Sequence, residues 1–295
     1  MKFRGYISIA FMAIRPKTLS VTVSPVMMGT IMAFSSNKGH FTSAIACFLS
    51  ALLIQIGTNL SNDYFDFLKG SDTKERIGPT RVTQAGLVSP EKMFYIFMFV
   101  FGLSILVGIY LVIRGGWPIV IIGILSIASG ILYTGGPMPI GYIGLGDIFV
   151  FIFFGPVALC GTFYVQTMEL PIEVFIAGLG PGFLAVCLLS INNLRDESTD
   201  KKSGKKTLAV RFGPNFVRGE YIFTLVMSLL IPVFLAFYIN SHWFICFTLM
   251  IFIPGYFAIR SIHHESGQEL NKTLNRTGKI ILLYGIIFSI GWWIG

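Results

Sequence analysis

Two short stretches of the sequence place Asn and Asp side chains one helical turn apart. The first acidic motif, 59–72, reads NLSNDYFDFLKGSD, and the second acidic motif, 191–207, reads INNLRDESTDKKSGKKT. Because residues three or four positions apart share one face of a helix, each motif presents its acids as a set, and neighbouring carboxylates repel unless a cation lies between them. The side chains that share faces in this way are Asn62, Asp63, Asp66, Asp196 and Asp200.

The chemistry that suits such sets is the binding of Mg²⁺ around a diphosphate. Hard oxygen ligands select Mg²⁺, which keeps several waters and binds through one or two carboxylates plus substrate phosphates, and bound metal neutralises charge on a leaving oxygen. We therefore predict a Mg²⁺ site formed by these five residues, with Asp72 as a further ligand that lies past Gly70 and off the helix. Basic side chains near the motifs are expected to clamp phosphate oxygens: Arg81, Arg195, Lys205 and Lys206.

Three further side chains stand at the boundaries of apolar segments. Arg15 is expected to contact either phosphate or a lipid headgroup. Tyr133 precedes the Gly/Pro-rich stretch 134–147 and is either a catalytic residue or an interfacial anchor. Asp147 is an isolated acid at a membrane boundary, which favours a functional site, and an acid at a helix N-terminus is the alternative. The stretch 78–81, Gly-Pro-Thr-Arg, is either an ordered loop over the phosphate or an ordinary connection.

The elements that carry these residues are predicted to be membrane-spanning helices. The 295-residue chain is 54% hydrophobic and 12% charged, about half the charge of a soluble domain, and its mean hydropathy is +0.75. Apolar runs of about 17–23 residues suffice to cross a hydrocarbon core of about 30 Å. The sequence thus predicts an all-α polytopic bundle of about nine spans around a central cavity: 18–36, 42–62, 92–113, 117–134, 145–166, 171–193, 219–239, 243–260 and 278–294.

The distribution of charge predicts how these spans are oriented. The net charge of +8 does not indicate nucleic acid, because the basic residues lie in loops between apolar runs. With the N-terminus in the cytoplasm, Lys38 and Arg114 are the only two of the 22 Lys and Arg residues in outer segments, and these residue types prefer cytoplasmic loops. We expect the N-terminus and both acidic motifs inside and the C-terminus outside.

The four cysteines fall in apolar runs and give no disulfide or metal signal.

The two acidic motifs form a faint internal repeat. Both are Asn-containing helix ends that run into a pair of Asp residues and then Gly and Lys, and they lie four predicted spans apart. Weak internal symmetry of this kind often brackets a central site in membrane proteins. We therefore expect a single domain, 1–295, with the two motifs facing each other across its centre.

These residues resemble the UbiA superfamily of intramembrane prenyltransferases, and within it the branch that acts on 1,4-dihydroxy-2-naphthoate. The resemblance runs almost the whole length of the chain. The stretches that carry it are Arg15-Pro16-Lys17-Thr18, Asn62-Asp63-Tyr64-Phe65-Asp66, Gly78-Pro79-Thr80-Arg81, Tyr133-Thr134-Gly135-Gly136-Pro137, Gly144-Leu145-Gly146-Asp147, Gly155-Pro156-Val157, Asn192-Asn193-Leu194-Arg195-Asp196 and Gly204-Lys205-Lys206-Thr207-Leu208.

The resemblance implies an activity and a set of site residues. It implies Mg²⁺-dependent transfer of a polyprenyl group from its diphosphate to the naphthoate ring with loss of CO₂, in the plasma membrane of a bacterium, with lipid as a further partner. The family's first motif matches through Asp66, but its last acid falls at Gly70, and Asp72 comes two residues late. The residues implied as catalytic are Asp63, Asp66, Asp196, Asp200 and Tyr133; those implied to bind diphosphate or acceptor are Asn62, Arg81, Lys205, Lys206, Arg15, Asn192, Arg195 and Asp147.

Two alternatives remain open from the sequence. The acceptor could be 4-hydroxybenzoate, homogentisate or a glycerol lipid, although Pro137 stands where hydroxybenzoate-type members carry a Lys after Tyr133. A cation-coupled transporter is the other class, and it predicts acids near the middle of the membrane. The Asp residues instead lie at predicted cytoplasmic ends, which favours the enzyme.

Overall fold

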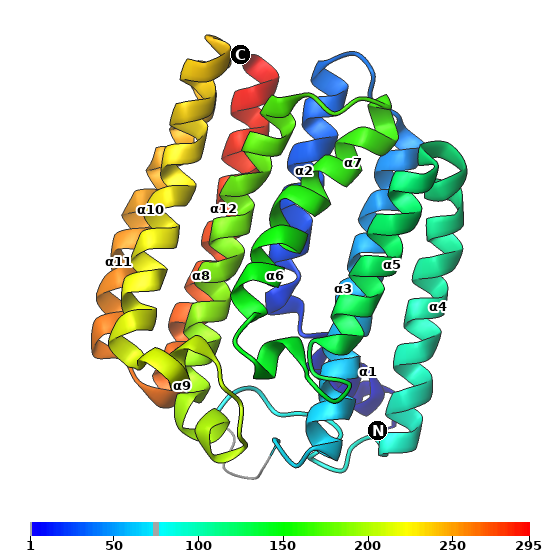
Figure 1. Ribbon diagram of the computed structural model, residues 1–295, viewed down its shortest axis with the longest axis vertical. Helices are drawn as coiled ribbons and strands as arrows, with labels where there is room; N and C mark the ends of the chain where they lie inside the picture. Colours follow the sequence, from blue (N-terminus) through cyan, green and yellow to red (C-terminus); the bar gives the residue numbers. More distant parts are fainter. Residues whose placement is uncertain (1, 73–76) are drawn as a thin grey trace.

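The chain forms a bundle of helices with its two ends at opposite ends of the bundle (Figure 1). The computed structural model describes residues 2–72 and 77–295, and in this part of the chain every regular element is a helix. The long helices run roughly along one direction, which is vertical in Figure 1. The predicted all-α fold is confirmed.

The first half of the bundle contains the first acidic motif and the loop that follows it. Helix α3 carries this motif in its last turns, and a long connection leads from it to α4. The elements of this half are α1 (Lys2–Ile14), the 3₁₀ turn η1 (Pro16–Thr18), α2 (Ser20–Ser35), α3 (Phe41–Leu68), α4 (Pro90–Gly115) and α5 (Trp117–Leu132).

The second half is arranged around α8, which carries the second acidic motif. The most apolar window of α8 is 78% buried, against 22% for the corresponding window of α3, so α8 is the central helix of the bundle. The elements are η2 (Ile140–Tyr142), α6 (Gly146–Ile152), the π-helical turn η3 (Phe153–Val157), α7 (Ala158–Thr167), α8 (Ile172–Lys202), α9 (Leu208–Phe212), α10 (Pro214–Ile239), η4 (Trp243–Ile251), α11 (Phe252–His264), η5 (Gly267–Glu269) and α12 (Leu270–Ile294).

The described residues contain fewer candidate spans than the nine that the sequence predicts. Within the described residues, seven helices are long and apolar enough to cross a membrane, and an eighth is counted if α1 and α2, bent by 58° at their junction, act as one span. Helix α5 has 16 residues, about 24 Å at 1.5 Å per residue, shorter than a hydrocarbon core of about 30 Å. The predicted 117–134 span is therefore the weakest, and the count of nine stays a prediction.

A close contact between η3 and α8 fixes the centre of the bundle. A Cβ atom at Gly155 would lie 2.6 Å from the Cα of Gly182 and 2.6 Å from the carbonyl oxygen of Gly178. Only glycines permit this approach, as is common where membrane helices meet. Pro156 lacks a backbone N–H and stands inside the π-helical turn. Helix α6 packs along α8, with Gly146 at its start close to Leu189, toward the end of α8 that carries the second acidic motif.

Candidate active site

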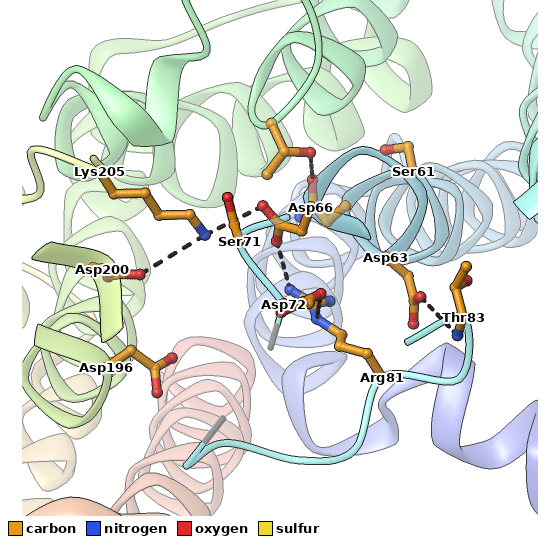
Figure 2. Close-up of polar contacts among 12 residues, drawn as sticks. Ser61, Asp63, Asp66, Ser71, Asp72, Arg81, Thr83, Asp196, Asp200 and Lys205 are labelled. Carbon is orange, nitrogen blue, oxygen red and sulfur yellow. Dashed lines mark hydrogen bonds and ion pairs between the residues drawn. The ribbon is translucent and has the colours of Figure 1, made fainter. Parts of the chain in front are cut away.

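The two acidic motifs meet at one end of the bundle, as the internal repeat predicted. Lys205, just past the end of α8, lies between them: its Nζ atom is 3.2 Å from Oδ1 of Asp66 and 3.8 Å from Oδ1 of Asp200. Figure 2 shows the Lys205 side chain reaching from the second motif toward Asp66, with Asp196 on the same side as Asp200. A single ammonium group thus joins the motifs.

Asp66 contacts three side chains from different parts of the chain. Arg81 donates from Nη2 to Oδ2 over 2.9 Å, and the hydroxyl of Tyr142 donates to Oδ1 over 2.8 Å. Lys205 is the third partner. The Asp66 side chain is only 2% exposed, and these three partners compensate for its removal from water. A buried carboxylate is stable only when it is paired and hydrogen-bonded in this way.

Asp63 points away from the other acids of the first motif. Its two carboxylate oxygens accept hydrogen bonds from the backbone N–H groups of Val82 and Thr83, each over 3.1 Å. The residue is 1% exposed and is not among those that line the cavity. In this conformation Asp63 holds the loop that carries Arg81 and offers no oxygen to a metal.

Asp72 lies beside Asp66 although it comes two residues late in the motif. Gly70 has φ +65°, the left-handed conformation typical of a residue that ends a helix, and the N–H groups of Ser71 and Asp72 return to the carbonyl oxygen of Asp66 over 2.9 and 3.4 Å. The turn brings the Asp72 carboxylate to 3.1 Å from Nε of Arg81. Arg81 therefore bridges Asp66 and Asp72, and the predicted phosphate clamp is already occupied by two acids.

Arg195 is likewise bound to protein groups. It contacts its neighbour Asp196 through two parallel hydrogen bonds, Nε to Oδ1 over 2.8 Å and Nη2 to Oδ2 over 2.7 Å, and donates from Nη1 to Asn271 over 2.9 Å. A Cβ atom at Gly78 would lie 2.8 Å from Nη2, so the 78–81 stretch packs directly on this guanidinium. The stretch is thus packed against Arg195, and its predicted place over the phosphate stays a prediction.

Tyr142 is a site residue that the sequence did not indicate. Besides its bond to Asp66, its hydroxyl lies 2.6 Å from Oγ of Ser71. The ammonium groups of Lys69 and Lys205 each lie 4.8 Å from the centre of its ring, within cation–π range. Burial, and then the charge of Asp66, raises the pKa of Tyr142, so the phenol stays protonated and donates. No spacing pattern connects it with Asp66, which is 76 residues away.

The remaining predicted residues divide into two groups. Those that line the cavity are Arg15, Asn62, Tyr133, Asn192, Arg195, Asp196 and Asp200. Lys206 does not: its side chain is exposed, and its backbone N–H donates to the carbonyl oxygen of Tyr142 over 2.8 Å. Gly204, at φ +76°, turns the chain so that Lys205 faces the motifs and Lys206 faces outward. Lys206 therefore lies outside the cavity lining, and its predicted phosphate contact stays a prediction.

Asp147, in the first turn of α6, lies near Tyr133, which caps the C-terminus of α5. Asp147 is 8% exposed, stands in the first turn of α6 and does not line the cavity, which agrees with the alternative of an acid at a helix N-terminus. A Cβ atom at Gly146 would lie 2.8 Å from the hydroxyl oxygen of Tyr133. The glycine leaves room for the Tyr133 ring at the cavity wall.

The cavity itself runs from the acidic motifs into the apolar part of the bundle. Its volume is about 1340 Å³, above the range of about 300–1,000 Å³ typical of small-molecule sites. Asp66, Asp200 and Lys205 line one end. The rest is lined mainly by aliphatic and aromatic side chains from α2 to α8, among them Val26, Ile54, Ile127, Phe149, Phe153 and Leu188. A charged end joined to a long apolar space suits a molecule with a charged head and an isoprenoid tail.

The residues fit a divalent cation in chemistry, but internal cations are already paired with them. Asp66, Asp196 and Asp200 line the cavity and supply hard oxygen donors of the kind that bind Mg²⁺, and the Lys205 ammonium stands between two of them as a positive charge would. Across residues 2–72 and 77–295, no three acidic, His or Cys side chains gather closely enough to hold a metal. The predicted six-residue ligand set is therefore not assembled, since Asp63 accepts from the backbone of the following loop and Asp72 is paired with Arg81.

Comparison with known proteins decides the family. Residues 22–286 match the UbiA prenyltransferase family. This chain belongs to the UbiA prenyltransferase family. Among similar UbiA relatives, the 1,4-dihydroxy-2-naphthoate octaprenyltransferase of Haemophilus influenzae is 35% identical over 292 residues, covering 95% of this chain and 94% of the relative. The enzyme of the same name from Escherichia coli is 35% identical over 288 residues, covering 95% and 93%.

Solved structures of UbiA proteins share the fold at low sequence identity. A UbiA homolog from Archaeoglobus fulgidus superposes with a TM-score of 0.69 at 16% identity, over 96% of this chain and 99% of that one. The same homolog bound to DMAPP and Mg²⁺ gives a TM-score of 0.64 at 14% identity, over 95% and 99%. At these identities the likeness establishes the membrane fold of this UbiA chain and nothing finer.

Proposed function

We propose that this UbiA-family chain transfers a polyprenyl group from polyprenyl diphosphate to 1,4-dihydroxy-2-naphthoate, with loss of CO₂, as a step of menaquinone biosynthesis. The observation that carries the proposal is the single cavity that joins the two acidic motifs to a long apolar space. It is supported by relatives at 35% identity over almost the whole chain that carry this activity in their names. The prenyl chain length is left open.

The charged end of the cavity is suited to hold a diphosphate. Lys205 and Arg81 line it together with the acids of both motifs. Divalent cations held by one or two of the cavity-lining acids at a time, Asp66, Asp196 and Asp200, would neutralise charge on the diphosphate leaving group. Lys205, on a flexible four-carbon stem, can turn from the acids to phosphate oxygens, while Arg81 stays between Asp66 and Asp72 and keeps the loop in place.

The apolar part of the cavity is suited to the rest of the reaction. The allylic C–O bond breaks with both electrons leaving on the diphosphate, and the allylic cation that remains is attacked by the electron-rich ring at the carbon that bears the carboxylate. The C–C bond to CO₂ then breaks and returns its electrons to the ring. Aromatic faces such as those of Tyr133, Phe149 and Phe153 line this space and can shield a cation from water.

Several broader features belong to the same proposal. We take 1–295 as one domain in a bacterial plasma membrane, with the N-terminus and the acidic motifs in the cytoplasm, because Lys38 and Arg114 are the only basic residues in the predicted outer segments. A cytoplasmic site gives Mg²⁺ and a water-soluble aromatic acid direct access. Lipid is the remaining partner, since many large apolar side chains of the long helices are exposed on the outside of the bundle.

A membrane assay separates the candidate acceptors. Membranes containing the protein are supplied with a polyprenyl diphosphate, Mg²⁺ and, in separate reactions, 1,4-dihydroxy-2-naphthoate, 4-hydroxybenzoate and homogentisate. We expect prenylated naphthoquinol and released CO₂ in the first reaction, with the Asp196→Ala membranes inactive. Turnover of hydroxybenzoate without turnover of the naphthoate would refute the assignment of the acceptor.

A further inference from the structure

Lys205 occupies the position between the two acidic motifs. Its side chain is 15% exposed, while those of Asp66 and Asp200 are 2% and 13% exposed. The ammonium group is a compact point charge, and between Asp66 and Asp200 it neutralises carboxylates that would otherwise repel one another across the cavity.

Lys205 is held by contacts at its backbone and at its ammonium group. The backbone N–H of Lys205 returns to the carbonyl oxygen of Asp200 over 2.9 Å, which anchors the residue to the end of α8. The ring of Tyr142 lies 4.8 Å from Nζ, and the hydroxyl of the same ring bonds Asp66. Only the four-carbon stem is left to move, so the ammonium can leave the acids without any change in the backbone.

A divalent cation shared by the two motifs would need the same oxygen lone pairs. Oδ1 of Asp66 accepts from both Tyr142 and Lys205, and Oδ1 of Asp200 faces Lys205. Two cations cannot occupy that gap together, because like charges a few ångströms apart repel strongly in a partly buried site. The metal and the ammonium group are therefore alternatives.

We propose that Lys205 is an internal counter-cation that competes with a divalent metal for Asp66 and Asp200, so that metal binds weakly until a diphosphate draws the ammonium away. The inference rests on the proposed function only in naming diphosphate as the group that draws it. It assigns Lys205 two alternating partners, the acids in the free protein and phosphate oxygens in the complex. Metal and diphosphate then bind cooperatively.

Direct titration with Mn²⁺ alone tests the competition. The purified full-length protein in detergent is titrated without any prenyl substrate, and bound Mn²⁺ is counted by electron paramagnetic resonance. We expect Lys205→Gln to bind Mn²⁺ at least about tenfold more tightly than wild type, because breaking an ion pair between nearly buried groups frees two carboxylates. Lys205→Met, which removes the charge with a side chain of similar length, is expected to behave in the same way.

Two matched variants separate competition at the gap from a general change in charge. Lys205→Arg keeps a cation in place and should bind Mn²⁺ as weakly as wild type. Lys201→Gln removes one positive charge next to Asp200 from an exposed position and should leave Mn²⁺ affinity within about twofold, since exposed charges are screened. The proposal would be overturned if Mn²⁺ affinity rose equally in Lys201→Gln and Lys205→Gln. It would also be overturned if Mn²⁺ affinity did not rise in Lys205→Gln and Lys205→Met.

Thermal unfolding gives a second readout that needs no activity. In EDTA, Lys205→Gln should melt at a lower temperature than wild type because Asp66 and Asp200 lose their shared cation, and Mn²⁺ should raise its melting temperature more than it raises that of wild type. An equal Mn²⁺ response in both proteins counts against competition. The Mn²⁺ titration and the melting experiment use no acceptor, so a negative transfer assay would not affect their result. Failure of the competition would likewise not affect the transferase assignment.

Discussion

The two acidic motifs have related sequences but different surroundings. In the first motif, Asp63 and Asp66 are each 1% exposed, and their partners come from the loop after α3 and from the stretch before α6. In the second motif, the side chains of Asp196 and Asp200 are 16% and 13% exposed and line the cavity. The first motif therefore organises the loops around the site, and the second presents its acids to a ligand in the cavity. Substitutions in the two motifs should separate these roles.

The largest effect is expected at Asp66, where both roles meet. Asp66→Ala should reduce prenyl transfer by about 1000-fold or more and also lower stability by about 3–5 kcal/mol, because it leaves buried Arg81 without one of its partners. Transfer in membranes and the melting temperature of the purified protein measure the two effects. Asp66→Asn, which still accepts a hydrogen bond, should recover part of the stability but not the transfer. A stable and active Asp66→Ala would remove the first motif from the site.

Asp196→Asn should lose activity with little loss of stability. The side chain faces the cavity, the amide oxygen can still accept from the buried Arg195, and Arg195 also retains its bond to Asn271. We expect transfer to fall by at least about 100-fold, the scale seen when one charge-stabilising group is removed from an active site. The melting temperature should stay within a few degrees of wild type. Glu197→Gln, which changes the next residue along α8, is the matched control and should retain transfer.

Asp63→Ala should show the reverse pattern. It removes the acceptor of two buried N–H groups, those of Val82 and Thr83, and each unsatisfied group costs about 1–3 kcal/mol. The melting temperature should drop clearly, and proteolysis near the α3–α4 loop should speed up. Transfer per folded molecule should fall by only about tenfold, since Asp63 lies outside the cavity lining. Loss of transfer as complete as that of Asp196→Asn, with normal stability, would restore Asp63 as a metal ligand.

The same contrast explains what the sequence could and could not predict. Apolar runs and helical spacing located the helices and grouped the acids, because both depend on neighbours in the chain. They could not show that Asp63 turns to a loop some twenty residues away, or that Gly70 returns Asp72 to Arg81. The difference between Lys205 and Lys206 depends on the left-handed turn at Gly204. Such contacts are set by turns and tertiary packing, which leave no periodic signal in the sequence.

Tyr142 gives the sharpest test of how the motifs are joined. Tyr142→Phe removes the hydroxyl that bonds Asp66 and Ser71 but keeps the ring beside Lys205. The loss of one hydrogen bond to a charged group is worth about 1.5–3 kcal/mol at most, and the remaining partners of Asp66 should limit the fall in transfer to about tenfold, seen mainly as a higher KM for the diphosphate.

Tyr142→Leu removes the ring as well and shows whether the cation–π contacts matter. Lys69 and Lys205 both lose the aromatic face that lies 4.8 Å from their ammonium groups, which is worth about 0.5–2 kcal/mol for each contact. Transfer should fall several-fold below that of Tyr142→Phe, and kinetics at varied diphosphate concentration measure the difference. If both variants have the same KM and kcat, the ring does not position Lys205, and the ammonium is held between the two motifs by Asp66 and Asp200 alone.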